Sequence, residues 1–214
     1  MKKLIGLKKA KVAVFISGTG SNLKNLIKFS NKKNSPISIN LIISNTKKAK
    51  GLKYANQYNI EKKVLNFNNN KINEKKNLDF LIKKETNFIC LAGFMKILSK
   101  NFIKRFKGKI INIHPSLLPK YKGLNTHKRV INNNENISGC SVHYVTAKLD
   151  SGKIIMQKKV KISKKDTAIS LRKKILKKEH KLYPAAIRKI FIYRNSKFFS
   201  NCSHFCFLWV SGSH

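Results

Sequence analysis

Two kinds of hydrophobic pattern alternate through the first half of the chain. The run "KVAVFIS" at residues 11–17 is almost continuously apolar and ends at Gly18, which predicts a buried parallel strand. Comparable runs predict three more strands, at 37–44, 88–93 and 109–114. Between these runs, apolar residues recur at helical spacing, at 22–29, 49–58 and 78–82. Strands that alternate with helices predict an α/β fold, with a Rossmann-like, doubly wound and mostly parallel sheet.

The pattern of the second half is different. "GCSVHYVT" at 139–146 and "KIIMQKKVKI" at 153–162 flank the turn-forming triplet Asp150-Ser151-Gly152, which predicts an antiparallel hairpin. Asp166 or Thr167 can cap a helix that runs to about residue 178, and Pro184 is expected to open another helix.

Loops and domain limits follow from composition. An Asn/Lys-rich loop is expected at 68–73, and a loop punctuated by Pro and Gly is expected to end at Gly123. Without an internal repeat or a dividing linker, residues 1–190 are expected to form a single domain. Residues 191–214 form a divergent tail with many aromatic residues. Such a tail is expected to pack on the domain or on a second subunit, in a monomer or a homodimer.

Charge is the unusual feature of the composition, with 47 Lys and Arg against 8 Asp and Glu, a formal net charge of +39. This excess is compatible with a nucleic-acid partner or with a compositional drift towards Lys, Asn and Ile. The lysines are spread over the whole length, which favours drift together with small anionic substrates. We therefore expect no nucleic-acid binding beyond non-specific charge attraction.

Cysteine and histidine spacing argues against a metal centre. The cysteines form no Cys-x-x-Cys pair, and His127, His143, His180, His204 and His214 make no metal-binding spacing with acids or cysteines. Free thiols in a reducing cytoplasm are expected. Apolar runs fall short of the roughly 20 residues of a membrane span, so a cytoplasmic protein without membrane contact is expected.

The segment "SGTGSN" at 17–22 stands between a predicted strand and a predicted helix. Its glycines allow close approach of the backbone to an anion, and the helix N-terminus favours a phosphate. The dinucleotide pattern is absent, because Leu23 occupies the position of the third glycine. The segment is a candidate phosphate loop, with an ordinary tight turn as the alternative.

A second group combines Asn112, His114 and Asp150. Asn112 and His114 face the same side at the carboxyl end of a strand, where open α/β sheets bind ligands. An amide can donate to a developing oxyanion, and an imidazole can exchange a proton near neutral pH. Asp150 is a carboxylate that can hold and charge an imidazole. From the pattern alone, separate structural turns remain the alternative to a catalytic site.

The segments "KVAVFISGTGSNL", "LAGFMKILS", "NIHPSLLPKYKG", "SVHYVTAKLDSG" and "EHKLYP" occur in the order typical of the phosphoribosylglycinamide formyltransferase family. The chain resembles this family over about residues 11–190. The resemblance implies formyl transfer from 10-formyltetrahydrofolate, as co-substrate, to the amine of glycinamide ribonucleotide in purine biosynthesis. It implies small-molecule substrates and no metal.

The resemblance also implies roles for single residues. Asn112, His114 and Asp150 match the catalytic residues, and Asp150 is expected to keep His114 charged. Gly20, Ser21, Asn22 and Glu179 match ribonucleotide contacts. Folate contacts match two segments, Asn112 and, weakly, one loop residue: Met95, Lys96, Ile97, Leu98, Asn112, Thr146, Ala147, Lys148, Leu149, Asp150 and Lys71.

Two departures affect the folate site. Lys96 stands where the family often has arginine, so charge is kept without bidentate geometry. Lys71 is only a weak match for a folate-contacting arginine.

Three other functions remain alternatives. A methionyl-tRNA formyltransferase shares the Asn-x-His-x-Ser-Leu-Leu-Pro pattern, but "YKGLNTHK" replaces its RGxxP pattern. A formyltetrahydrofolate hydrolase would have an extra N-terminal domain, which is not expected here. A basic nucleic-acid-binding protein on a degenerate enzyme fold is disfavoured by the intact Asn112, His114 and Asp150.

Overall fold

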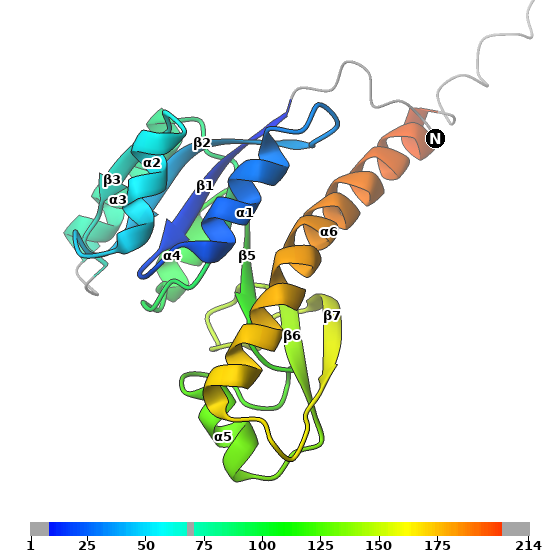
Figure 1. The fold of residues 1–214 in the computed structure, drawn as a ribbon. Coiled ribbons are helices and arrows are strands. Elements are labelled where there is room, and N and C mark those ends of the chain that lie inside the picture. Colours follow the sequence, from blue (N-terminus) through cyan, green and yellow to red (C-terminus); the bar gives the residue numbers. More distant parts are fainter. Residues whose placement is uncertain (1–8, 68–70, 203–214) are drawn as a thin grey trace, which may run out of the picture.

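The computed structural model describes residues 9–67 and 71–202, and within these ranges seven strands form one sheet. The strand order is β3-β2-β1-β4-β5-β6-β7 (Figure 1). Strands β1 to β5 are parallel, whereas β6 pairs antiparallel with both β5 and β7. The predicted α/β fold and the antiparallel hairpin are confirmed. The strands are β1 Ala10–Ile16, β2 Ile37–Ser44, β3 Glu61–Val64, β4 Phe88–Leu91, β5 Lys109–His114, β6 Ile137–Tyr144 and β7 Ile154–Lys161.

Helices cover both faces of this sheet. They are α1 Ser21–Ser30, the 3-10 helix η1 Lys50–Leu52, α2 Lys53–Gln57, α3 Lys71–Lys83, α4 Lys100–Arg105, α5 Thr126–Asn132 and α6 Ala168–Cys202. Residues 71–73 belong to α3, so the predicted loop over 68–73 is wrong for these three positions, while 68–70 lie outside the described residues.

The final helix also differs from the prediction. Pro184 lies inside α6 and does not open a new helix, so that prediction is wrong. A proline has no N–H to donate to the carbonyl four residues earlier, which here belongs to His180. The Nδ2 of Asn25 donates to this carbonyl at 2.6 Å and so replaces the missing helical hydrogen bond. The helix therefore continues through residue 190 to Cys202, and a separate tail over 191–214 stays a prediction, with 203–214 outside the described residues.

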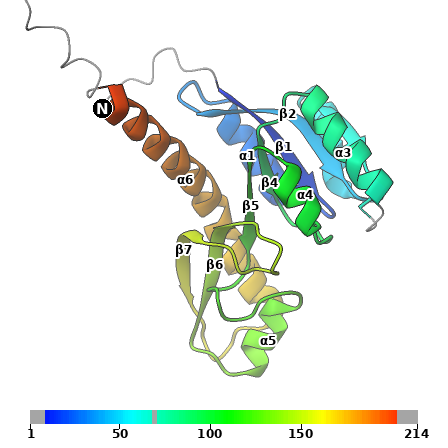
Figure 2. The same cartoon turned by 180° about the vertical axis from the view of Figure 1, so that it is seen from behind.

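The core has two halves because side chains of a strand alternate between faces. Val12 and Val14 of β1 lie in the cluster that includes α1 and α6. Ala13 and Phe15 lie in the cluster that includes α3 and α4. Figures 1 and 2, which are seen from opposite sides, show α1 and α6 on one face and α3 and α4 on the other.

The strand order of the sheet reverses between β1 and β4. The chain leaves β1 towards β2 on one side and later adds β4 and β5 on the other, and open α/β sheets bind ligands at such a point. Here the backbone N–H of Ser17 donates to the Gly93 carbonyl at 3.1 Å. The Ser17 hydroxyl also accepts from the N–H of Met95 at 2.8 Å. The loops that follow β1 and β4 are thus joined at the crevice.

Within the described residues, none of the helices is long and apolar enough to span a bilayer. Cys90 and Cys140 are buried free thiols, and burial raises the pKa of each to about 12.

Candidate active site

Three segments that are distant in the sequence supply the catalytic candidates. Asn112 and His114 lie at the carboxyl end of β5, and Asp150 lies in the loop between β6 and β7. Asp150 adopts a left-handed conformation with φ 44°. Such strained positions for a residue with a Cβ are typical of functional sites.

The loop that holds Asp150 is closed by a tight backbone contact. A Cβ on Gly152 would lie 1.7 Å from the carbonyl oxygen of Tyr144, so only glycine fits there. Asp150 is further fixed by the backbone N–H of Gly123, which donates to its Oδ2 at 2.9 Å. The turn predicted from Asp150-Ser151-Gly152 therefore also positions a carboxylate.

The geometry brings Asp150 between two imidazoles. Its Oδ2 lies 3.4 Å from Nδ1 of His114, and its Oδ1 lies 3.6 Å from Nε2 of His143. All three side chains are less than one tenth exposed. The structure thus brings His114 and Asp150 together, as the sequence suggested, and adds a second histidine.

Hydrogen bonds indicate which ring nitrogen of each imidazole carries a hydrogen. Nε2 of His114 lies 2.9 Å from the Tyr121 carbonyl oxygen, and a carbonyl only accepts, so this nitrogen carries a hydrogen. Nδ1 of His114 is left to exchange a proton on the side of Asp150. In His143, Nδ1 donates to the Tyr144 carbonyl at 2.8 Å. Its Nε2 is then an acceptor, and the Nδ2 of Asn112 lies 3.2 Å away.

Burial and charge act in opposite directions on His114. Burial lowers its pKa below the ordinary value, and the Tyr121 carbonyl and the Asp150 carboxylate offset only part of this effect. Asp150 thus acts on His114 in the expected direction, and burial is the larger effect. Burial alone would raise the pKa of Asp150, but the nearby imidazoles of His143 and His114 and the hydrogen bond from the backbone N–H of Gly123 lower it. The pair is thus a neutral imidazole beside an ionised carboxylate.

The candidate phosphate loop connects β1 to α1. Gly20 caps α1 in a left-handed conformation with φ 74°, and its added Cβ would lie 2.7 Å from Cα of Gly51. The N–H of Gly51 donates to the Gly18 carbonyl at 2.9 Å. Two glycine backbones in contact hold the loop at the N-terminus of α1, where N–H groups and the helix dipole favour an anion.

Asn22 and Glu179 meet next to this loop. The Nδ2 of Asn22 donates to Oε2 of Glu179 at 2.7 Å, although 157 positions separate them in the sequence. Both residues are buried. Burial raises the pKa of Glu179, and the hydrogen bond from Asn22 counteracts this effect in part.

Tyr183 fixes the part of α6 that carries Glu179. Its buried hydroxyl lies 2.9 Å from the carbonyl of Leu91 in β4 and 3.2 Å from that of Ile111 in β5. These contacts fix the position of α6 relative to the two strands whose carboxyl ends form the site.

The expected folate segments lie around the crevice with apolar side chains exposed. Met95 is 63%, Ile97 64% and Leu149 48% exposed, whereas Leu98 is buried. Lys96 and residues 146–148 are exposed, and Lys71 is the first residue of α3. Exposed apolar side chains in such a place are available to pack against a planar ligand.

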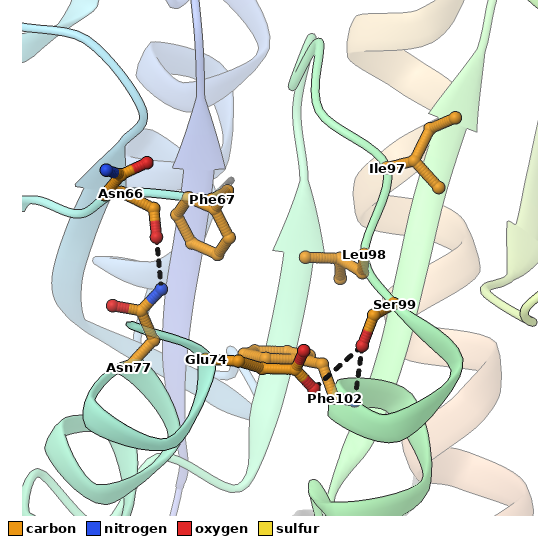
Figure 3. A pocket seen from close by; sticks show the side chains of 8 residues that line it. All are labelled: Asn66, Phe67, Glu74, Asn77, Ile97, Leu98, Ser99 and Phe102. Atoms are coloured by element: carbon orange, nitrogen blue, oxygen red, sulfur yellow. Dashed lines mark hydrogen bonds between the residues drawn. The ribbon is translucent and has the colours of Figure 1, made fainter. Parts of the chain in front are cut away.

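A small pocket between α3 and α4 explains how one of these segments is held (Figure 3). Ile97 and Leu98 line it, and Oε1 of Glu74 accepts from Ser99 Oγ and from Asn101 Nδ2, each at 2.8 Å. The Ser99 hydroxyl also caps α4 through the N–H of Phe102 at 3.0 Å. With a volume of about 20 Å³ the pocket has room for about one water molecule, so its walls serve to support the segment.

The positions of His143, Gly51 and Tyr183 in the site were not predicted from the sequence. His143 shares one face of a correctly predicted strand with Ser141, but its pairing with Asn112 depends on register between strands. Among the described residues, no group of three or more His, Cys, Asp or Glu side chains is arranged to hold a metal ion.

Comparison with known proteins gives the same fold and names a family. The family model of formyl transferases matches residues 10–187. The human trifunctional purine biosynthetic protein adenosine-3 is 40% identical over 186 residues, which are 86% of this chain and 18% of that protein. The chain thus spans less than a fifth of the length of this relative.

Proteins named phosphoribosylglycinamide formyltransferase match over most of their length. The phosphoribosylglycinamide formyltransferase of Haemophilus influenzae is 41% identical over 181 residues, 83% of this chain and 85% of that protein. The crystal structure of the phosphoribosylglycinamide formyltransferase from Anaplasma phagocytophilum superposes with a TM-score of 0.79 at 42% identity, covering 84% of this chain and 85% of that one.

Proposed function

The chain belongs to the formyl transferase family, and on that premise we propose that it transfers a formyl group from 10-formyltetrahydrofolate to the amine of glycinamide ribonucleotide. The products are formylglycinamide ribonucleotide and tetrahydrofolate, within purine biosynthesis in the cytoplasm. The observation that carries the proposal is the cluster of Asn112, His114 and Asp150, next to a loop suited to a phosphate.

The ribonucleotide is anchored by the loop after β1. Backbone N–H groups of Gly20, Ser21 and Asn22 at the start of α1 receive its phosphate, because a helix N-terminus favours a dianion. Glu179, held by Asn22, accepts hydrogen bonds from hydroxyl groups of the same substrate. This contact explains why a carboxylate is kept in a buried position that raises its pKa.

The folate lies across the exposed apolar side chains of the crevice. Met95, Ile97 and Leu149 cover its ring system, and Lys96 supplies a positive charge for its carboxylates. Both folate segments adjoin the catalytic cluster, since one follows β4 and the other ends at Asp150.

The reaction needs one proton to move from one nitrogen to another. The substrate amine attacks the formyl carbon, and the amide of Asn112 donates to the oxygen that becomes negative. Neutral His114 accepts the proton that the amine loses, and Asp150 stabilises the imidazolium, since protonated Nδ1 then has an acceptor at 3.4 Å. His114 returns the proton to the folate nitrogen as the bond from that nitrogen to the formyl carbon breaks.

An assay with three acceptors tests this function. The purified chain receives 10-formyltetrahydrofolate together with glycinamide ribonucleotide, with methionyl-tRNA, or with water alone, and tetrahydrofolate release is measured. We expect turnover only with the ribonucleotide, and a loss of about 10²-fold or more in His114→Ala, the scale of acid–base catalysis. Faster turnover with the tRNA, or release without an acceptor, would assign the chain to another branch of the family.

A further inference from the structure

A basic groove lies on the face of the sheet that α1 and α6 cover, between α6, β7 and α1. It has a volume of about 860 Å³. Four of its lysines, at positions 174, 177, 178 and 181, follow the i, i+3, i+4, i+7 spacing of one helix face. Lys159 and Lys161 of β7 border the groove on either side of the buried Val160. A row of positive charge on α6 therefore lines one wall of a concave surface that β7 closes.

Acidic side chains neutralise little of this charge. Lys174 pairs with Asp166, whereas Glu179, the acid nearest to the other lysines in the sequence, is turned to Asn22. Among the described residues, the other five lysines have no carboxylate within salt-bridge distance. Charge spread by compositional drift would be solvated on convex surfaces, but here four like charges are gathered along one wall of a groove, where they repel one another.

The base of the groove offers a further polar group. Val160 is buried there, and Nε2 of His180 is buried without a hydrogen-bond partner among the described residues. A buried polar nitrogen without a partner is uncommon in a folded protein, and a bound group that accepts or donates a hydrogen bond would satisfy it. The adjoining Asn25 is already used, because its Nδ2 donates to the His180 carbonyl.

We propose that this groove binds a small anion with several phosphate groups, such as an oligophosphate. The α6 lysines span about 10 Å, since seven residues rise by about 1.5 Å each, so they can contact successive phosphates. The volume is in the range of small-molecule sites, about 300–1,000 Å³. Among the described residues, none that lines the groove is Phe, Tyr or Trp, so these residues give no platform for stacked bases, which distinguishes the groove from a single-strand nucleic-acid channel.

The test uses sodium triphosphate as the probe, with isothermal titration calorimetry on the full chain at about 150 mM salt, where long-range attraction is screened. The groove variant carries Lys177→Gln, Lys178→Gln and Lys181→Gln. A matched control carries Lys75→Gln, Lys76→Gln and Lys83→Gln on α3, on the opposite face of the sheet. We expect the groove variant to bind triphosphate about tenfold or more weakly, which corresponds to about 1.4 kcal/mol, and the control to bind as the unaltered chain does.

Several results would overturn the proposal. These are no binding to the unaltered chain, equal losses in both variants, or displacement of triphosphate by glycinamide ribonucleotide, which would place the probe in the phosphate loop after β1. Tighter binding of oligouridylate RNA that depends on the same lysines would make the occupant a nucleic acid. Thermal unfolding checks that both variants fold. Because binding is measured without a formyl donor, its outcome is separate from that of the formyl-transfer assay.

Discussion

Asn112 and His143 face each other across β5 and β6, and the amide nitrogen of Asn112 lies 3.2 Å from Nε2 of His143. The Tyr144 carbonyl fixes His143 as an acceptor towards Asn112. One hydrogen of the Asn112 amide is thereby directed to the imidazole, and the other stays available to an oxyanion. His143 is thus a positioning residue for Asn112.

Replacement of His143 tests this relationship. We expect His143→Ala to lower kcat by about fivefold, because a hydrogen bond that orients a donor is worth about 1 kcal/mol, and to change the KM of either substrate little. His143→Gln keeps an acceptor and should recover part of kcat. The two variants are compared by steady-state kinetics. A rise in KM with kcat unchanged would mean that His143 acts in substrate binding.

The charge of Asp150 should be visible in the pH–rate profile. Its carboxylate raises the pKa of His114 against the larger lowering by burial, so Asp150→Asn lowers that pKa further. Neutral His114 accepts the proton, and the rate falls on the acid side where the imidazole becomes protonated. The acid limb should therefore move to lower pH, with kcat at neutral pH reduced by about 10²-fold. An acid limb that does not move would assign Asp150 to the turn alone.

Local patterns were sufficient to predict the strands that position the site. Continuous apolar runs are visible for β1, β2, β4 and β5 because parallel strands are buried on both faces. The edge strand Glu61–Val64 is exposed along its length and has no such run, so it was missed. The six residues of α4 are too few to show a helical period, although Ser99 supplies a cap.

Contacts between distant segments could not be derived in the same way. Asn22 and Glu179 are joined only because α6 returns to the N-terminal end of α1, and the path of α6 depends on a helix that continues through Pro184. That continuation requires the amide of Asn25 as a substitute donor, which no local rule supplies. The family resemblance, rather than spacing, indicated Glu179.

Ser17 should couple the two substrate loops. Its hydroxyl donates to Oδ1 of Asn45 and accepts from the N–H of Met95, so one side chain fixes the ends of the loops after β1 and β4. We expect Ser17→Ala to raise the KM of both the ribonucleotide and the folate by about fivefold, since each lost hydrogen bond costs about 1 kcal/mol. A change confined to one substrate would show that the loops respond separately.

Exchange of the two buried polar residues separates stability from binding. Asn22→Asp places a second carboxylate against Glu179, and two buried like charges strongly disfavour the folded state. We expect a lowered Tm together with weakened ribonucleotide binding.

Glu179→Gln alone should raise Tm at neutral pH. Because the pKa of Glu179 is raised, its ionised carboxylate destabilises the folded state. This loss of folding free energy grows as the pH rises above 4.5, the ordinary pKa of a glutamate side chain.

The double variant Asn22→Asp, Glu179→Gln restores a hydrogen bond with reversed polarity, because the Gln amide donates to the new carboxylate. Its Tm should return close to that of the unaltered chain, by about 2–4 °C for each kcal/mol recovered. Ribonucleotide binding should stay weak, since a negative charge remains beside the phosphate, while folate binding is kept. Thermal unfolding and separate titrations of the two substrates measure these quantities. If the double variant regained ribonucleotide affinity along with its stability, the phosphate would have to bind elsewhere than at the start of α1.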